Sequence, residues 1–282
     1  MKMKSTRRSF LQGMGLSAAA LAAGCRCPFG QGAVPIALQL YSIHRIFWDA
    51  PERILAELKA GGYDGVEFAG YGGRAAKDIA KLLKDAGLRG AGTHVNGNVD
   101  LVGDGLKRTL DFCAEAGLES VVTPHAQRNS AAEYVRFGHD MGLAAEAAAS
   151  YGIKVGIHTT YHHFKTKYDG VPAWDLMFQD ASPLLQQQVD TSNTFNTGTD
   201  VVALLRKYPE RHHSIHAKEN VPTVDGTFGV PPTDGGACVP WADVIAYMKT
   251  ERTQKWWIVE AEGKPAELGP ALASRRILAS WL

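Results

Sequence analysis

Residues 76–94 of this 282-residue chain read AKDIAKLLKDAGLRGAGTH, and this stretch combines a helix, a glycine and a short strand. Apolar side chains at positions 79, 82, 83 and 86 share one helical face, and charged side chains occupy the opposite face. Gly87 follows the last turn, where glycine supplies the left-handed conformation that ends a helix. A run of small residues then leads to His94. The stretch predicts one helix–strand unit with a polar residue at the carboxyl end of its strand.

The same pattern recurs along the chain, with glycine stops spaced by about thirty residues, the size of a βα unit. Further helices are expected at 55–59, 106–116, 131–150, 201–207, 241–249 and 268–282. Strands are expected at 36–40, 65–68, 90–93, 120–123, 155–157, 184–189, 214–215 and 256–259. A doubly wound sheet would usually carry a glycine-rich loop after its first strand, but residues 39–43 there read QLYSI. The predicted fold is therefore an α/β fold, a single (β/α)8 TIM barrel over residues 34–282.

The first 24 residues predict an export signal rather than part of the fold. A twin-arginine pair, Arg7-Arg8, precedes an apolar, Ala-rich stretch over residues 13–24 that is too short to span a bilayer. Residues 22–25 (AAGC) resemble a lipoprotein cleavage site, so Cys25 is a candidate for lipidation, with a plain cleaved signal as the alternative. Residues 25–33 are expected to form a short linker. The expected location is the periplasm. If Cys25 is lipidated, the protein is expected on the outer side of the inner membrane, held there only by this lipid anchor.

The charge balance excludes few partners but disfavours nucleic acid. The whole chain has 30 basic and 29 acidic residues, and removal of residues 1–24 takes away four basic ones, which leaves 26 against 29 and a net charge of −3. The rest of the chain has no lysine or arginine run, so the basic footprint of a nucleic-acid-binding protein is missing. Export permits a Cys113–Cys238 disulfide, although thiols far apart in sequence are more often unpaired. A homo-oligomer is left open.

Polar residues follow every predicted strand. In a parallel barrel the carboxyl ends of all strands meet at one mouth, where active sites are built. A titratable group at the end of each strand from the second to the eighth therefore predicts an active site at that mouth. In chain order these strand-end residues are Tyr41, Glu67, His94 with Asn96, His125, His158, Asp190, His216 with Lys218, and Glu260 with Glu262.

Four of these residues, His158, Asp190, His216 and Glu260, predict a metal site. Two imidazoles and two carboxylates form a mixed nitrogen–oxygen ligand set, which suits Ca²⁺ less well than a transition-metal ion. Mn²⁺ is the expected ion, and Zn²⁺, Co²⁺, Fe²⁺ or Mg²⁺ are the alternatives. Such an ion would polarise the carbonyl of a sugar and stabilise the enediolate formed when the neighbouring C–H proton leaves. Glu260 is the expected base for that proton.

The remaining strand-end residues receive supporting roles. Lys218 is expected to stabilise developing negative charge on oxygen, with a plain surface lysine as the alternative reading. Glu67 is a candidate acid or base, or a partner of Lys218. The histidine pairs at 162–163 and 212–213 are expected at the rim or surface, because adjacent side chains point in different directions. Sugar contacts are expected from Tyr41, His94, His125, His163 and Glu262.

Several of these segments together resemble the xylose-isomerase-like TIM-barrel superfamily, whose members include sugar phosphate isomerases and epimerases. Residues 62–70 (GYDGVEFAG) resemble the second strand of that family, and His216-Ala217-Lys218-Glu219 resembles its His-x-Lys-Asp segment. The glycine-rich turn and Trp-led helix at 234–245 and the strand end at 259–262 (VEAE) are also similar. The resemblance covers nearly all of the chain after the signal and implies metal-dependent sugar isomerase or epimerase chemistry.

The chain departs from this family at one metal position. The family site usually uses Glu, Asp, His and Glu, and Asp190, His216 and Glu260 match the last three, whereas His158 replaces the first. The family's epimerases use two opposed glutamates as bases, and here one is missing. Isomerisation of a sugar, or β-elimination from a keto-sugar or 3-keto-glycoside, then fits better than two-glutamate epimerisation. Export and the lack of an arginine cluster favour a non-phosphorylated substrate, and a non-catalytic sugar-binding lipoprotein is the alternative from another class.

Overall fold

The computed structural model describes residues 34–219, 239–251, 253–262 and 266–282. The predicted export signal over residues 1–24, the Cys25 lipidation site, the linker over 25–33 and Cys238 lie outside the described residues and stay predictions. Within the described part, Cys113 is buried and forms no disulfide. No helix among the described residues has the length and apolar character needed to cross a membrane.

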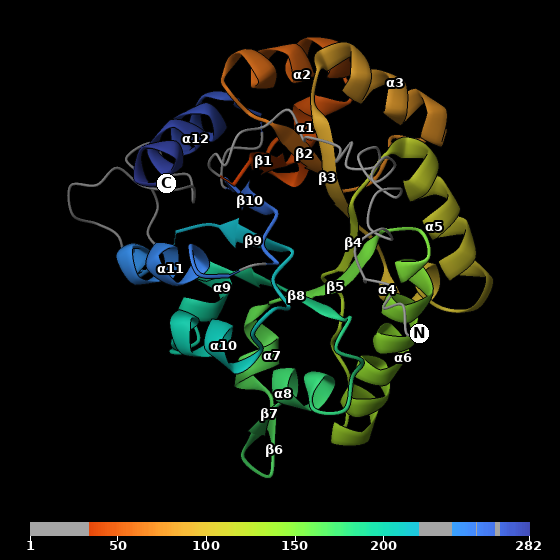
Figure 1. The fold of residues 1–282 in the computed structure, drawn as a ribbon, viewed down its shortest axis with the longest axis vertical. Helices are drawn as coiled ribbons and strands as arrows, with labels where there is room; N and C mark the ends of the chain where they lie inside the picture. The colour runs from red at the N-terminus through yellow and green to blue at the C-terminus, as the bar shows by residue number, and fades with distance from the viewer. Residues whose placement is uncertain (1–33, 220–238, 252, 263–265) are drawn as a thin grey trace, which may run out of the picture. The chain divides into compact units, whose positions relative to one another are not determined.

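Eight parallel strands close into a barrel in the order in which they occur along the chain (Figure 1). The first strand pairs with the last through Ile36–Trp257, Ala37–Ile258 and Leu38–Val259, which closes the sheet. The strands are β1 (Ile36–Gln39), β2 (Gly65–Phe68), β3 (Arg89–His94), β4 (Ser120–Thr123), β5 (Lys154–His158), β8 (Gln186–Asp190), β9 (Ser214–Ala217) and β10 (Trp256–Val259). The predicted (β/α)8 barrel is confirmed.

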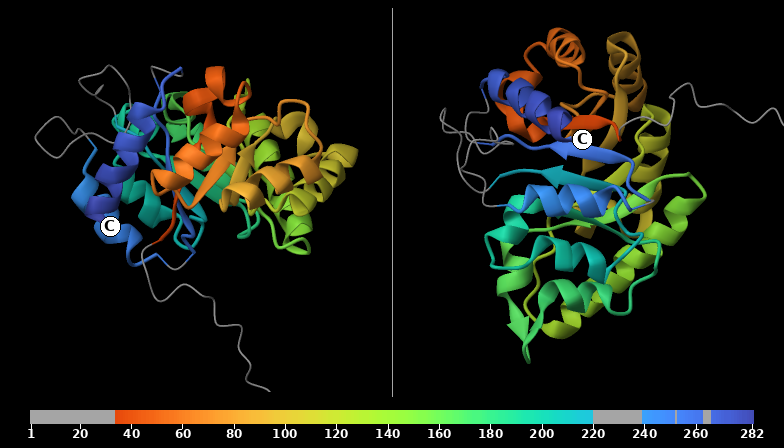
Figure 2. Two further views of the ribbon diagram at one scale, coloured as in Figure 1. Left: turned by 90° about the horizontal axis from the view of Figure 1, so that it is seen from above. Right: turned by 60° about the vertical axis from the view of Figure 1, so that its left-hand side comes forward.

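Helices surround this barrel on the outside, as the views from two further directions show (Figure 2). The predicted helices at 76–86 and 201–207 have those bounds in the structure, and the others differ by a few residues. The main helices are α2 (Pro51–Ala60), α3 (Ala76–Ala86), α5 (Gly103–Ala116), α6 (Ala131–Ala149), α10 (Val201–Lys207), α11 (Trp241–Met248) and α12 (Gly269–Trp281). Short elements lie between them: η1 (Leu40–Ile43), α1 (His44–Phe47), α4 (Gly97–Asp100), α7 (Tyr161–Lys165), the hairpin β6 (Lys167–Tyr168) and β7 (Val171–Pro172), α8 (Ala173–Phe178) and α9 (Thr191–Phe195).

The glycine stops act as predicted. Gly87 adopts φ 66° after α3, and its N–H donates to the carbonyl groups of Leu83 and Lys84. Gly117 adopts φ 73° after α5. Both values lie in the left-handed region that residues with a Cβ rarely enter, so each glycine ends its helix and returns the chain to the next strand.

The interior of the barrel is apolar at one end and polar at the other. Ala37, Ala91, Trp256 and Ile258 form a small buried cluster inside it. The indole N–H of Trp256 donates to Glu119, and the Arg89 guanidinium lies 4.5 Å from the Trp256 ring centroid, so this end of the barrel is filled. Since side chains alternate along each strand, residues two positions further along point into the same interior. That alternation carries polar side chains to the carboxyl ends of the strands.

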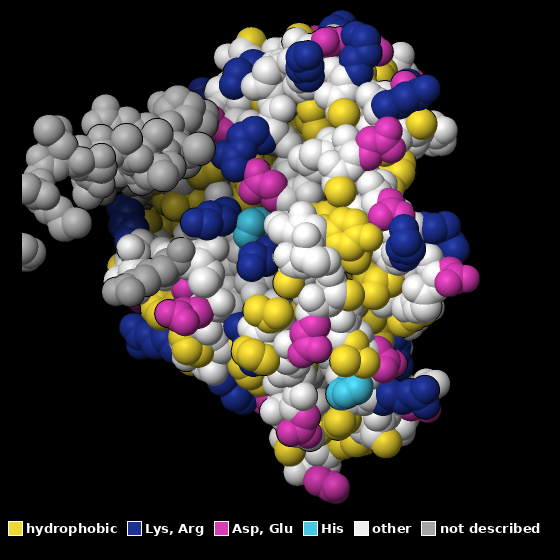
Figure 3. Space-filling model, turned by 45° about the vertical axis from the view of Figure 1, so that its right-hand side comes forward, with side chains coloured by type: hydrophobic (Ala, Val, Ile, Leu, Met, Phe, Trp, Pro, Cys, Tyr) yellow, Lys and Arg dark blue, Asp and Glu magenta, His cyan; other side chains and the backbone are white. Residues whose placement is uncertain are grey.

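Charged side chains of both signs are mixed over the face that carries α5 and α6 (Figure 3). On this face no broad area of positive charge is present among the described residues.

Candidate metal centre

The structure brings the four predicted metal ligands together at the carboxyl ends of neighbouring strands. His158 ends β5, Asp190 ends β8, His216 lies in β9, and Glu260 directly follows β10. Each of the four residues is at most 6% exposed. One ligand atom from each residue lies within 4.8 Å of the corresponding atoms of the others, a geometry that could hold a metal ion.

Asp190 supplies the observation that favours a cation in this cluster. Its Oδ1 accepts a hydrogen bond of 2.8 Å from the backbone N–H of Asn193. Its Oδ2 is buried and has no hydrogen-bond partner among the described residues. Nζ of Lys218 lies 3.7 Å and Nε2 of His158 3.8 Å from this oxygen. Because an unpaired buried carboxylate oxygen is costly, a bound divalent ion would satisfy this atom, and the donor set fits one.

His216 is held between two carboxylates. Its Nδ1 lies 2.7 Å from Oε2 of Glu260, and its Nε2 lies 2.7 Å from Oε2 of Glu67. Burial by itself lowers the pKa of this imidazole, but the two carboxylates outweigh it and raise the pKa to about 10. The ring is therefore protonated without a metal. Metal binding at Nδ1 would release one proton from the ring. Nε2 would keep its hydrogen and donate it to Glu67, and a metal-binding histidine usually has such a hydrogen-bond partner at its other nitrogen.

Gln188 orients the second imidazole. Its amide nitrogen donates to Oε1 of Glu67 at 2.7 Å and to the Ser214 hydroxyl at 2.9 Å, so its oxygen acts as an acceptor. That oxygen lies 3.0 Å from Nδ1 of His158, which therefore carries the hydrogen. Burial, followed by the neighbouring His216 and His94, holds the pKa of His158 well below its ordinary value. The ring is neutral, and the lone pair on its Nε2 is available to a metal.

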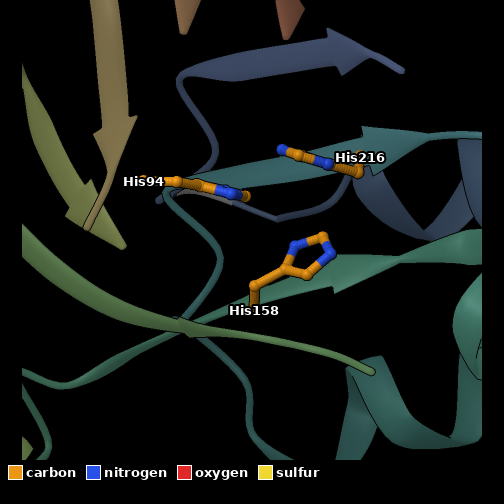
Figure 4. A group of neighbouring side chains, drawn as sticks. All are labelled: His94, His158 and His216. Atoms are coloured by element: carbon orange, nitrogen blue, oxygen red, sulfur yellow. The ribbon is translucent and has the colours of Figure 1, made fainter. Parts of the chain in front are cut away.

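His94 points toward His158 and His216 from β3, as Figure 4 shows. Its ring is stacked on His216 at a centroid distance of 5.4 Å. Its Nε2 lies 2.7 Å from the same oxygen of Gln188 and 3.3 Å from Oε2 of Glu67, so it serves as a donor to acceptors. The three histidines also meet the distance condition for a metal site. However, the mixed set with Asp190 and Glu260 fits better, because it leaves out His94, whose Nε2 donates to the Gln188 oxygen.

Glu67 lies completely buried among these rings. It accepts hydrogen bonds from Gln39 at 2.6 Å, from Gln188 and from His216. Burial alone raises the pKa of this carboxyl, but His94 and His216 outweigh it and hold the pKa well below its ordinary value. Glu67 is ionised and is not among the described residues that line the cavity next to the site.

Lys218 is buried rather than a surface lysine, with 6% of the residue exposed. Its ammonium lies 2.8 Å from Oε2 of Glu262, 3.6 Å from Oε1 of Glu260 and 3.7 Å from Oδ2 of Asp190. Burial lowers the pKa of this amine, but the three carboxylates outweigh it and raise the pKa above its ordinary value. Burial and the neighbouring Glu260 also raise the pKa of Glu262, the carboxylate that lies closest to the Lys218 ammonium, to about 7.

A cavity of about 910 Å³ opens next to the cluster. Eight of the predicted strand-end residues line it, namely Tyr41, His94, Asn96, His125, His158, Lys218, Glu260 and Glu262. Polar residues that were not predicted for the site also line it, among them Gln39, Arg108, Thr160 and Asn193. The cavity thus connects the buried cluster with a space large enough for a small organic substrate.

The other histidines lie elsewhere. His163 is buried, its Nδ1 accepts from the backbone N–H of Thr160, and its ring packs on Trp174 at 5.5 Å. His212 and His213 are buried as well. The expected rim or surface position is therefore wrong for these three residues, although His162 is exposed. His163 is not among the described residues that line the cavity, and its geometry is that of a helix cap.

Gln39 and Gln188 were not predicted as site residues. Gln188 lies two positions before Asp190, and side chains two apart on a strand face the same way. This spacing was a usable signal, since a buried amide next to a ligand in sequence is a natural partner for the ligands around it.

Comparison with known proteins is consistent with this architecture. Residues 55–281 match the model of the family described as Xylose isomerase-like TIM barrel, and the chain belongs to that family. A comparison with curated protein sequences found no match.

Solved structures show the same fold. A sugar phosphate isomerase/epimerase from Parabacteroides distasonis superposes with a TM-score of 0.74 and 19% identity, over 88% of this chain and 96% of that one. A 3-keto-D-glucoside 4-epimerase from E. coli gives a TM-score of 0.60 and 17% identity, over 88% and 99%. An L-ribulose 3-epimerase gives 0.64 and 13%, over 88% and 93%.

Proposed function

We propose that this protein is a divalent-metal-dependent enzyme that moves a proton next to the carbonyl of a non-phosphorylated sugar or keto-sugar, as an isomerase or epimerase acting through an enediolate. The observation that carries the proposal is the buried His158–Asp190–His216–Glu260 cluster, in which Oδ2 of Asp190 has no hydrogen-bond partner among the described residues. Lys218, Glu260 and Glu262 extend from this cluster to the cavity wall. Mn²⁺ is the ion we favour.

Glu260 and Lys218 have separate roles in this reaction. When bound, the metal supplies polarisation of the substrate carbonyl. Oε2 of Glu260 lies 2.7 Å from Nδ1 of His216, on the side of the metal site, so we assign Oε1, which faces Lys218, as the atom that accepts the C–H proton. The electron pair of that bond forms the double bond of the enediolate, and the Lys218 ammonium stabilises the charge on its oxygen. Return of the proton to the adjacent carbon, with transfer of the hydroxyl proton from the oxygen of the deprotonated carbon to the former carbonyl oxygen, gives the isomer.

A lyase is the second candidate, and His158 favours it. The histidine stands where the family resemblance places a glutamate, so a base on the opposite side of the sugar is not supplied from that position. Loss of the proton next to the keto group of a 3-keto-glycoside would let the electron pair expel the glycosidic oxygen and leave an unsaturated sugar. Lys218 is a poor base for this step because it is an ammonium held by three carboxylates. It would instead stabilise the oxygen that gains charge.

The cellular setting is part of the proposal. The twin-arginine segment supports export to the periplasm, with Cys25 as a candidate lipid anchor, and sugar phosphates are scarce there. A non-catalytic sugar-binding lipoprotein would share this fold, signal and cavity. It would bind sugars without converting them.

Metal analysis and product analysis test the proposal. Purified protein is loaded with Mn²⁺, and His216→Ala, Glu260→Gln and the exposed control His139→Ala are compared for bound metal. Loss of metal is expected in the first two alone, and full retention in both would remove the site assignment. The loaded protein is then incubated with sugars and 3-keto-glycosides. An isomeric ketose supports the isomerase, an unsaturated sugar supports the lyase, and binding without conversion supports the sugar-binding protein.

A further inference from the structure

We propose that the substrate is a glycoside rather than a free monosaccharide, with its second ring bound in a distinct outer part of the cavity. The inference rests on the proposed function, because it places the reacting sugar at the metal centre. We call this part the outer arm and define it by Tyr71, Asn96, Arg108, Thr109 and Phe112, all of which line the cavity.

The cavity is larger than one sugar ring requires. Its inner end is formed by His94, His158, Lys218, Glu260 and Glu262. A monosaccharide bound there by its carbonyl and adjacent hydroxyl fills a minor part of 910 Å³, a volume near the upper end of the roughly 300–1,000 Å³ range of pockets for drug-sized ligands. We assign the remaining space to the outer arm, whose residues also line the cavity.

Helix α5 presents one continuous face to the outer arm. Gly105, Arg108, Thr109 and Phe112 are spaced i, i+3, i+4 and i+7, so they share one side of the helix. Leu110 and Cys113 are buried in the core on another side. At position 105 a Cβ atom would lie 1.9 Å from the carbonyl oxygen of Val99, so glycine there allows α4 to pack closely against α5. The arm is therefore built on packed helices.

An aromatic pair and polar groups give the outer arm its chemistry. The Tyr71 and Phe112 rings lie 4.2 Å apart between centroids at an interplanar angle of 31°. The Tyr71 hydroxyl is directed toward Cys113, 3.9 Å from its Sγ, so this polar end turns into α5. Aromatic walls of this kind bind the apolar face of a sugar ring or an aryl ring. Arg108 and Thr109 add hydrogen-bonding groups beside it.

The arm is not built for a strongly charged group. Asp100 also lines the cavity and accepts from the backbone N–H of Asn96 at 2.9 Å, so the lining contains an acidic side chain as well as Arg108. A neutral ring joined to the reacting sugar through a glycosidic oxygen matches this mixture. Such a substrate also contains the leaving group that elimination requires.

Binding measurements with matched ligands test the inference. The probes are 3-keto-glucose, its phenyl glycoside, and the disaccharide that carries glucose in place of the phenyl group, each titrated against the Mn²⁺-loaded chain. We expect at least one glycoside to bind tenfold or more tightly than 3-keto-glucose. Preference for the phenyl compound identifies an aryl second ring, and preference for the disaccharide identifies a sugar. Equal or weaker binding of both glycosides would overturn the inference.

Variants of α5 separate the two ends of the cavity. Thr109→Trp fills the outer arm and is expected to weaken glycoside binding tenfold or more, with 3-keto-glucose binding changed by less than twofold. Arg108→Ala should weaken glycoside binding by a smaller factor. Lys107→Ala is the matched control, because Lys107 is exposed on the same helix and pairs with Asp111 away from the cavity. Equal losses for both ligand types in Thr109→Trp would contradict a separate outer arm.

The result remains readable if the proposed reaction is wrong. If the protein does not use Mn²⁺, 3-keto-glucose will bind equally well with and without the ion. If the protein is not an enzyme for this substrate, 3-keto-glucose will bind without forming product. The ratio between glycoside and 3-keto-glucose affinities would still report on the outer arm.

Discussion

Glu67 combines complete burial with a full set of hydrogen-bond donors around it. Gln39, Gln188 and His216 all donate to its two oxygens. At the sequence level its strand-end position predicts an acid or base, whereas its contacts are those of a residue that orients the imidazole behind the metal. A carboxylate in this place raises the basicity of the ligand nitrogen on the other side of the ring.

Replacement of Glu67 tests this orienting role. Glu67→Gln keeps the shape of the side chain but removes the charge that faces His216, so Mn²⁺ affinity is expected to fall about 10- to 100-fold. Isothermal titration with Mn²⁺ measures the change. Asp64→Asn is the matched control, because Asp64 caps the backbone N–H of Ile36 at the other end of β2. Unchanged Mn²⁺ affinity in a folded Glu67→Gln protein would contradict the role.

Helix packing outside the barrel can be tested at Gly138. Within a helix, alanine normally stabilises relative to glycine by about 1 kcal/mol. At this position in α6, however, a Cβ atom would lie 1.8 Å from the carbonyl oxygen of Met177 in α8, and the backbone must move. Overpacking of this kind costs about 1–3 kcal/mol or more, so the clash outweighs the propensity gain.

The expected result is a lower free energy of unfolding for Gly138→Ala, measured by urea denaturation. Gly269→Ala in α12 is the control, because a Cβ there meets no atom within 4 Å. That variant should show a change between zero and a stabilisation of about 1 kcal/mol. If both variants behave alike, the contact between α6 and α8 is not as close as described.

The long elements could be predicted from sequence because their signals are local. The helix over 76–86 could be predicted from the helical spacing of its apolar residues and from Gly87 after its last turn. The strand ends could be predicted from the positions where apolar runs stop. The segment between β5 and β8 could not be predicted, since α7, the β6–β7 hairpin and α8 are too short to show a period. Signals of this length carry little information on their own.

The hydrogen-bonded network of the site was also beyond the sequence. Gln188 and Glu67 are 121 residues apart, and only closure of the barrel makes them neighbours. The burial of His212 and His213 has a related cause. They directly precede β9 and are covered by neighbouring elements: Nε2 of His212 lies 3.0 Å from the carbonyl oxygen of Leu205 in α10, and the backbone N–H of His213 donates to the Gln186 side chain in β8.

At the scale of the whole molecule, buried neutral histidines predict acid sensitivity. Burial lowers the pKa of His163 to about 3 and that of His213 to about 4. In the unfolded chain both titrate near about 6.5, so below that pH the unfolded state binds more protons than the folded state. Stability therefore falls as pH drops from about 6.5 to about 4, by roughly 1.4 kcal/mol per pH unit for each histidine.

Urea denaturation at about pH 7 and about pH 5 measures this loss. His213→Gln removes one titrating group, so its loss between the two pH values should be smaller than that of the wild type by about 2 kcal/mol. His139→Gln is the control, since the side chain of His139 is 61% exposed, and it should keep the wild-type loss. An identical loss in all three proteins would show that His213 does not remain neutral in the fold.

Metal binding should stabilise the whole barrel, because its ligands come from four strands that lie apart in the sequence. A ligand that binds only the folded state at 100 times its Kd adds about 2.7 kcal/mol, which for a domain of this size raises Tm by roughly 5–10 °C. Treatment with EDTA should lower Tm, and added Mn²⁺ should restore it. His216→Ala should show neither change, because it lacks one ligand and the imidazole that Glu67 orients. If Mn²⁺ raises the Tm of His216→Ala as much as that of the wild type, the ion binds elsewhere and the four strand ends do not form its site.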